Sequence, residues 1–290
     1  MIMSSTSPTI IRTMSDLNNL QKNKSILIAG FPGPGLVGSI STSYIIDKLN
    51  MHQIACVESE YISPGVIYVD GKLRHPFRLY ANKEGNVCVL VCEAPIIING
   101  IHSVLNTVMD WAIKNAIQEV LVLDGISVQG IPRPDRQPII LGSTEMDENV
   151  VDSNSNKNDD DKNEKDIPLY TSHHDITSNL NRNAIGDSNK KYTTFIGGIA
   201  GGLLSACLSY QIPCAAILVP SSSGIPDPEG ASILIESYNS IIKDENLKIN
   251  PDQLKEQGQS LKKQLEQIIK TEQEQRDQGS VTEQQGLMYG

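Results

Sequence analysis

The strongest constraint on the fold lies near the start of the chain, where a short apolar run leads through a glycine-rich turn into a helical pattern. The run is Ser25–Gly30 (SILIAG), and an unbroken apolar run of this length predicts a strand buried on both faces. From Gly35 to Leu49 apolar residues recur at intervals of three and four, which predicts a helix with one buried stripe. A buried strand followed directly by a helix is the unit from which parallel sheets are built.

Strand and helix patterns continue to alternate along the chain. Two runs, Val66–Val69 and Phe77–Tyr80, flank an Asp70-Gly71 turn and predict a hairpin. Such alternation indicates a domain of the α/β class, with a mostly parallel sheet between two helical layers. The other predicted strands are Gln53–Val57, Val87–Cys92, Val120–Leu123 (ended by Asp124-Gly125), Thr193–Ile196 and Cys214–Val219, and the other predicted helices are Ile101–Ile117, Leu203–Tyr210, Pro228–Ile242 (with Asp227 as its N-cap) and Pro251–Arg276.

Composition sets three segments apart from a single domain over residues 24–276. Residues 1–23 are polar, which predicts a loosely ordered arm. Residues 143–190 hold eleven acidic, five basic and nine Asn residues, which predicts a disordered acidic insertion that interrupts the domain. Residues 277–290 are polar until the last four, which predicts a flexible tail after the C-terminal helix.

The charge balance and the cysteines exclude several classes of protein. With 34 acidic and 24 basic residues the net charge is −10, which argues against binding to nucleic acid or to an anionic membrane surface. No apolar run approaches the ~20 residues of a membrane-spanning helix. The five cysteines lie in apolar runs, which indicates free buried thiols and a cytoplasmic protein. Cys88 and Cys92 lack two further ligands at suitable spacing, so we expect no metal.

The turn Gly33–Gly38 reads G-x-G-x-x-G, and Glu58 follows twenty residues later. This spacing is that of a dinucleotide-binding fingerprint. However, Pro34 removes one of the N–H groups that would hold phosphate. The glycines alternatively allow a tight turn and close packing of helix on strand, which we favour. A small-molecule or nucleotide-binding enzyme that uses Gly33–Gly38 therefore remains the alternative function.

Other polar residues offer weaker signals of catalysis. Ser221–Gly224 follows a strand end and could bind an anion, while His75, His102 and Asp124 could supply acid–base chemistry. Each has a structural explanation, such as Asp124 in an Asp-Gly turn, and no two have the spacing of a catalytic motif. We therefore expect no catalytic residue, no cofactor and no enzymatic activity.

The last three residues, Met288, Tyr289 and Gly290, form a distinct candidate site. An apolar side chain, a tyrosine and a carboxylate at the end of a polar tail suit insertion into a pocket on a partner protein. The apolar groups would be desolvated, the tyrosine hydroxyl would add a hydrogen bond, and the carboxylate would pair with a buried cation.

Three segments together resemble the proteasome assembly chaperone family. They are Gly30–Ser39 (GFPGPGLVGS), Ile196–Leu204 (IGGIAGGLL) and Gly224–Ala231 (GIPDPEGA), in the family's order. The resemblance covers residues 24–270 apart from the acidic insertion, which departs from the family's pattern. It implies a phosphorylase-like three-layer α/β domain.

The resemblance also implies a function. Members are ATP-independent chaperones, or chaperone homologues, that act on the 20S proteasome, and archaeal members form homo-oligomers. Some end in a hydrophobic-Tyr-X motif that docks between α-subunits of the proteasome ring, with the last carboxylate facing a lysine. Met288, Tyr289 and Gly290 match this motif position by position. The motif can also open the proteasome gate, so the resemblance implies activation as much as assembly.

Overall fold

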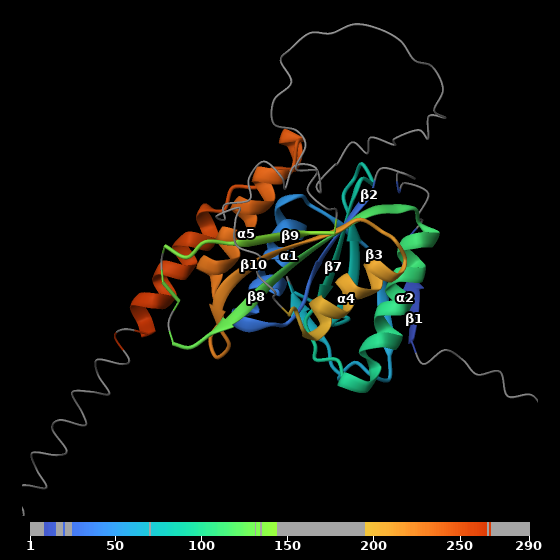
Figure 1. Ribbon diagram of the computed structural model, residues 1–290, viewed down its shortest axis with the longest axis horizontal. Coiled ribbons are helices and arrows are strands. Elements are labelled where there is room, and N and C mark those ends of the chain that lie inside the picture. The colour runs from blue at the N-terminus through green and yellow to red at the C-terminus, as the bar shows by residue number, and fades with distance from the viewer. Residues whose placement is uncertain are drawn as a thin grey trace, which may run out of the picture.

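The computed structural model describes a three-layer α/β body (Figure 1). The described residues are 9–15, 20, 25–69, 71–130, 132–133, 135–143, 195–265 and 267. The strands are β1 (Thr9–Thr13), β2 (Ser25–Gly30), β3 (His52–Ser59), β4 (Ile67–Val69), β5 (Lys72–Arg74), β6 (Phe77–Ala81), β7 (Val87–Cys92), β8 (Ile117–Val128), β9 (Ile139–Gly142) and β10 (Cys214–Ser222), and the helices are α1 (Val37–Lys48), α2 (Ile101–Lys114), α4 (Gly198–Ser209) and α5 (Pro228–Ile241). Residues 252–265 form a further helix.

The main sheet has eight strands within the described part of the chain, in the order β1-β3-β6-β7-β2-β8-β10-β9. The four central strands, β7, β2, β8 and β10, are parallel neighbours. Strand β3 runs the same way, while β1, β6 and β9 run antiparallel to their neighbours. Thus five of these eight strands share one direction, and the predicted α/β class with a mostly parallel sheet is confirmed.

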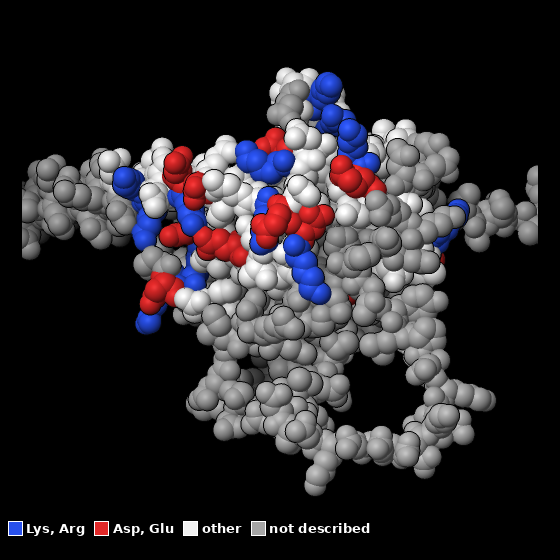
Figure 2. Space-filling view, turned by 90° about the horizontal axis from the view of Figure 1, so that it is seen from above, with Lys and Arg blue, Asp and Glu red and all other residues white. Residues whose placement is uncertain are grey.

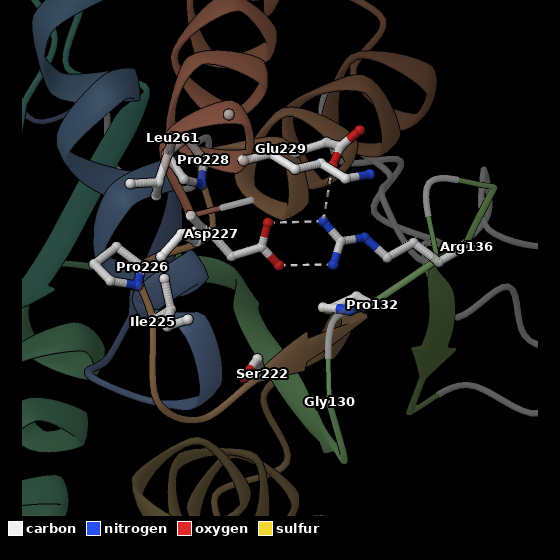
Figure 3. Close-up of a pocket in the computed structure, with 13 residues that line it drawn as sticks. Gly130, Pro132, Arg136, Ser222, Ile225, Pro226, Asp227, Pro228, Glu229 and Leu261 are labelled. Atoms are coloured by element: carbon white, nitrogen blue, oxygen red, sulfur yellow. Dashed lines mark hydrogen bonds and ion pairs between the residues drawn. The ribbon is translucent and has the colours of Figure 1, made fainter. Parts of the chain in front are cut away.

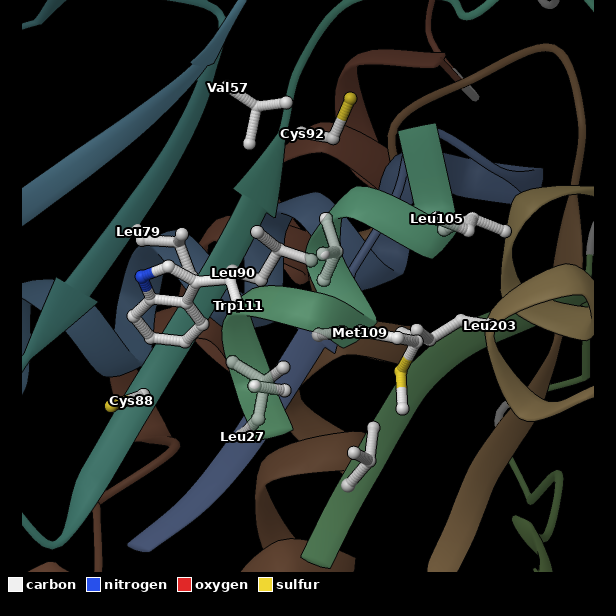
Figure 4. Close-up of a cluster of buried hydrophobic side chains, with 14 of the residues drawn as sticks. Leu27, Val57, Leu79, Cys88, Leu90, Cys92, Leu105, Met109, Trp111 and Leu203 are labelled. Carbon is white, nitrogen blue, oxygen red and sulfur yellow. The ribbon is translucent and has the colours of Figure 1, made fainter. Parts of the chain in front are cut away.

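Each face of the sheet carries one helical layer, because the central strands are apolar on both sides. In β2, Leu27 and Ala29 pack in the layer of α2 and α4, whereas Ile26 and Ile28 pack in the layer of α1 and α5. Figure 4 shows Leu105, Met109 and Trp111 of α2 and Leu203 of α4 among the buried side chains of the first of these layers.

Two predictions are wrong because of how the strands pair: the hairpin between Val66–Val69 and Phe77–Tyr80, and the end of a strand at Leu123. The hairpin forms between β4 and β5, immediately around Gly71, and makes a separate two-stranded sheet. Phe77–Tyr80 instead belongs to β6, which is buried at every position and pairs with β3 and β7. Strand β8 does not end before Asp124-Gly125, because its parallel pairing with β10 continues as far as Val128 and Ser222.

The predicted arm over residues 1–23 is wrong at β1, which pairs antiparallel with β3 along the edge of the sheet. Other parts of the prediction also shift. Phe195 and Ile196 are not in a strand, and α4 begins at Gly198 rather than Leu203. Edge strand β9 was not predicted. The C-terminal helix is confirmed over residues 252–265, whereas residues 144–194 and 268–290, with most of the predicted insertion and all of the predicted tail, lie outside the described residues.

Among the helices of the described residues, none has the length and apolarity needed to cross a membrane.

Candidate functional site

The carboxyl ends of β2, β8 and β10 meet at one edge of the sheet. After β2 the chain enters α1 on one face. After β8 it forms edge strand β9, and the next described helix is α4 on the other face. Because β2 and β8 are neighbours, their connections diverge and leave a crevice between the two strand ends. In open α/β sheets, such a divergence point is where ligands bind. The glycine-rich turn and Asp124 both lie at this edge.

The glycines of the turn are required by close packing. A Cβ on Gly35 would lie 1.9 Å from Ser221 Oγ, and one on Gly33 would lie 2.3 Å from Asp124 Oδ1. A Cβ on Gly38 would lie 2.4 Å from the carbonyl oxygen of Leu123. Gly35 also has a φ of +63°, a region that glycine occupies without strain. These contacts support the packing role that we favoured for the motif.

The turn does not present a row of free N–H groups to a phosphate. The N–H of Leu36 donates to the carbonyl of Gly33, the N–H of Val37 donates to that of Pro34, and Pro34 has no N–H. Glu58, at the ribose position of the fingerprint, accepts two hydrogen bonds from Arg12 at 2.7 and 2.8 Å. This geometry opposes the dinucleotide reading of Gly33–Gly38.

Asp227 joins the third motif to the turn through a dense set of hydrogen bonds (Figure 3). Its carboxylate accepts from both terminal nitrogens of Arg136 at 2.7 Å and from Ser221 Oγ at 2.6 Å. It also accepts the N–H of Gly230 at 2.8 Å, which confirms Asp227 as the N-cap of α5. The N–H of Asp227 donates to the carbonyl of Gly35 at 2.8 Å. The hydroxyl of Ser221 therefore donates to Asp227 and is not free to donate to an anion.

An apolar hollow of about 240 Å³ lies beside this ion pair, between the start of α5 and the helix over residues 252–265 (Figure 3). Its apolar lining is Pro132, Ile225, Pro226, Pro228, Leu261 and Leu265.

A larger pocket, of about 560 Å³, opens at the ends of β2 and β8. Its only ionisable lining residue in the described chain is Asp124. Asp124 Oδ1 accepts the N–H of Gly125 at 2.8 Å, and no basic side chain pairs with the carboxylate within the described residues. Burial raises the pKa of Asp124 to about 6. The structure thus places Asp124 in a strand and a pocket, not in the turn that we predicted.

The remaining candidates are not brought together with Asp124. His102 is exposed in the first turn of α2, and no hydrogen bond or ion pair joins it to another candidate in the described chain. His75 instead lies with Cys56 and Glu58, and their ligand atoms are within 4.8 Å of one another. Sequence reasoning missed this group, although Cys56 and Glu58 are two apart on one strand. Arg12 forms an ion pair with Glu58 there and holds the pKa of Glu58 below the usual value.

All five cysteines are free and buried, as predicted. On the face seen in Figure 2, the acidic and basic side chains are interspersed rather than gathered by sign. Met288, Tyr289 and Gly290 lie outside the described residues.

Comparison with known proteins shows where this fold belongs. Residues 27–269 match the PAC2 family. A Thermoplasma acidophilum protein of unknown function is 29% identical, with a TM-score of 0.63 over 91% of this chain and 93% of that one. Pyrococcus furiosus PbaA, an archaeal homolog of proteasome-assembly chaperone, is 19% identical with a TM-score of 0.68, over 98% and 100% of the two chains. PbaB of the same organism, an archaeal proteasome activator, is 17% identical with a TM-score of 0.66, over 91% and 99%.

The family match includes all three motifs of the sequence and most of the chain, and the similar structures extend over nearly the whole of it. The resemblance found from the motifs is confirmed: this chain belongs to the PAC2 family.

Proposed function

We propose that this chain is a non-enzymatic protein that binds the 20S proteasome core particle, as an assembly chaperone, a gate-opening activator or both. Membership of the PAC2 family carries the proposal, together with the whole-length likeness to proteins described as a proteasome-assembly chaperone homolog and a proteasome activator. The partners are the α-subunits of the particle.

The anchor in this proposal is the tail that ends in Met288, Tyr289 and Gly290. The methionine and tyrosine would lose water in a pocket between α-subunits, and the last carboxylate would pair with a lysine there. The fourteen residues from Asp277 to Gly290 span at most about 46–50 Å when extended, so a tail of this length reaches a pocket well away from the body.

A homo-oligomer forms part of the same mechanism. One short tail in one shallow pocket binds weakly, whereas several tails on a symmetric assembly bind with gains of ~10²–10⁴ in avidity if their spacing fits the ring. The α/β body then acts as the platform that sets this spacing.

The contacts at the strand ends support a body without catalysis at the glycine motif. The glycines lie where a side chain would collide with neighbouring atoms, and the polar groups nearby cap a helix or pair with one another. A positioned nucleophile with a free base beside it, which acyl or phosphoryl transfer requires, is not among these described contacts.

A peptidase assay with the 20S particle of the same organism tests the proposal. Full-length protein is compared with a chain that ends at Leu287, and Gln284→Ala serves as a matched change within the tail that spares the last three residues. We expect full-length protein and Gln284→Ala to raise hydrolysis of a short fluorogenic peptide, or to comigrate with the particle on a native gel, and the truncated chain to do neither. Equal binding by the truncated chain would contradict the tail mechanism. No binding by the full-length protein would contradict the proposed function.

A further inference from the structure

We propose that the pocket around Asp124 binds a small organic ammonium ion with an apolar body, such as an alkylamine or an arylalkylamine. The proposal does not rest on proteasome binding. The inference rests on where the pocket lies, how its walls are built and what its carboxylate lacks.

The pocket occupies the place in the topology where α/β sheets bind ligands. One wall comes from the segment that follows β2, with Phe31 and Pro32, and another from β8, with Asp124 and Ile126. These two strands are neighbours, and the next described helices along the chain, α1 after β2 and α4 after β8 and β9, cover opposite faces of the sheet. The pocket therefore lies at the kind of divergence between neighbouring strands where open α/β sheets bind ligands. Its volume of about 560 Å³ suits a small organic molecule.

Among the described residues, the side chains that line the pocket are apolar apart from the carboxylate of Asp124 and the hydroxyl of Ser127. Phe31, Ile96, Ile101, Ile126, Ile196 and Leu218 supply the apolar lining. Such walls favour the body of an organic ligand over a hydrated metal ion, because Ca²⁺ or Mg²⁺ would need several oxygen ligands and the described lining offers a single carboxylate.

The carboxylate of Asp124 is held in place, but no basic side chain of the described residues pairs with it. Its Oδ1 is fixed by the N–H of Gly125 at 2.8 Å and by contact with Gly33, where even a methyl group would collide. Its Oδ2 accepts no hydrogen bond from the described residues. The contrast with Asp227 is direct, since that carboxylate receives hydrogen bonds from Arg136, Ser221 and Gly230.

A half-buried carboxylate with no cation beside it is costly to maintain, and a bound ammonium group would remove the cost. The ammonium would donate to Oδ2 in a charge-assisted hydrogen bond, while the rest of the ligand would lose water against the apolar walls. A neutral alcohol of the same shape would gain from burying its apolar body but would not form the charge-assisted hydrogen bond.

Isothermal titration calorimetry at pH 8 with phenethylamine and isoamylamine tests the proposal on the full-length chain. The matched alcohols, phenethyl alcohol and isoamyl alcohol, are neutral probes of the same body. Asp124→Asn removes the charge with little change in shape, and Asp47→Asn, on the exposed surface of α1, is the control for loss of a carboxylate. Ile126→Trp fills the pocket and leaves Asp124 in place.

We expect the unaltered chain and Asp47→Asn to bind both amines at least about tenfold more tightly than the alcohols, a difference of about 1.4 kcal/mol. Asp124→Asn should lose that preference, and Ile126→Trp should lose amine binding while circular dichroism shows both variants folded. Three outcomes would overturn the proposal: no amine binding to the unaltered chain, equal affinity for amines and alcohols, or full amine affinity in Asp124→Asn.

Discussion

The guanidinium of Arg136 and the carboxylate of Asp227 form a two-pronged ion pair, with both N–O distances at 2.7 Å. Only 4% of the Arg136 side chain and 13% of the Asp227 side chain are exposed. The pair ties the segment after β8 to the start of α5, and Asp227 in turn holds the glycine turn through its own N–H. Two of the three family motifs, Gly30–Ser39 and Gly224–Ala231, are therefore joined through Asp227.

Replacing Arg136 by Met should destabilise the fold strongly. The change leaves the buried carboxylate of Asp227 without its cation, and removal of one partner from such a pair costs about 3–5 kcal/mol of unfolding free energy. Urea denaturation followed by circular dichroism measures the effect. Arg12→Met is the matched control, because Arg12 makes the same two-pronged contact with Glu58 at an exposed site. Comparable losses in the two variants would show that burial of the Arg136–Asp227 pair contributes nothing special.

Replacing Gly35 by Ala should destabilise the fold more than replacing Gly71 by Ala. Both glycines have positive φ, so both variants meet the left-handed strain of about 1–2 kcal/mol. At Gly35 the new Cβ also overlaps Ser221 Oγ, whereas at Gly71 the nearest atom is 4.0 Å away. We expect Gly35→Ala to lose a further ~1–3 kcal/mol, as overpacked sites do. Equal midpoints of urea denaturation would contradict the packing role of the motif.

How far the sequence predicts this site depends on the range of each interaction. The strand at Ser25–Gly30, the packing glycines and the cap at Asp227 are encoded within a few residues, and all three are confirmed. The partner of Asp227 is not encoded locally, because Arg136 lies 91 residues earlier and has no motif around it.

The turn predicted at Asp124 does not form, because strand pairing with a distant segment overrides the local preference of the Asp-Gly dipeptide. Asp-Gly is a strong turn dipeptide, yet pairing of β8 with β10 keeps the chain extended through it. Strand β1 was missed for a similar reason, since its five residues gain their order from pairing with β3 and not from their own pattern.

Asp124 should make stability depend on pH in a direction opposite to most carboxylates. Burial raises its pKa from 3.8 to about 6, so the folded state holds this proton more tightly than the unfolded state. The associated stability is full below pH 3.8 and is lost as the pH rises through 6, a change on the order of 3 kcal/mol. The Asp124→Asn variant has no titrating group at this position, so its stability should not show this loss.

The stability difference between Asp124→Asn and the unaltered chain should therefore grow in favour of the variant between pH 4 and pH 7. Urea denaturation across that range measures the difference, and Asp47→Asn corrects for the loss of one negative charge. A difference that stays constant with pH would show that Asp124 is well solvated.

The thiols of Cys88 and Cys92 should be unreactive in the folded protein. Burial raises the pKa of Cys88 to about 12 and that of Cys92 to about 11, and the reactive thiolate is correspondingly scarce. An aromatic disulfide reagent should label neither of these two thiols rapidly in native conditions, and it should label all five cysteines in denaturant. Rapid labelling of Cys88 or Cys92 in native protein would reveal local opening of the core around that thiol.

A peptide of the last fourteen residues should bind the 20S particle much more weakly than the full-length chain. If several tails act together on an oligomer, the loss of avidity weakens binding by ~10²–10⁴. Competition on the particle between labelled full-length protein and the peptide measures this ratio, and a peptide with Tyr289→Ala serves as the control for specific docking. A free peptide that binds as tightly as the whole protein would remove the need for an oligomer, and a control peptide that competes equally well would remove the role of Tyr289.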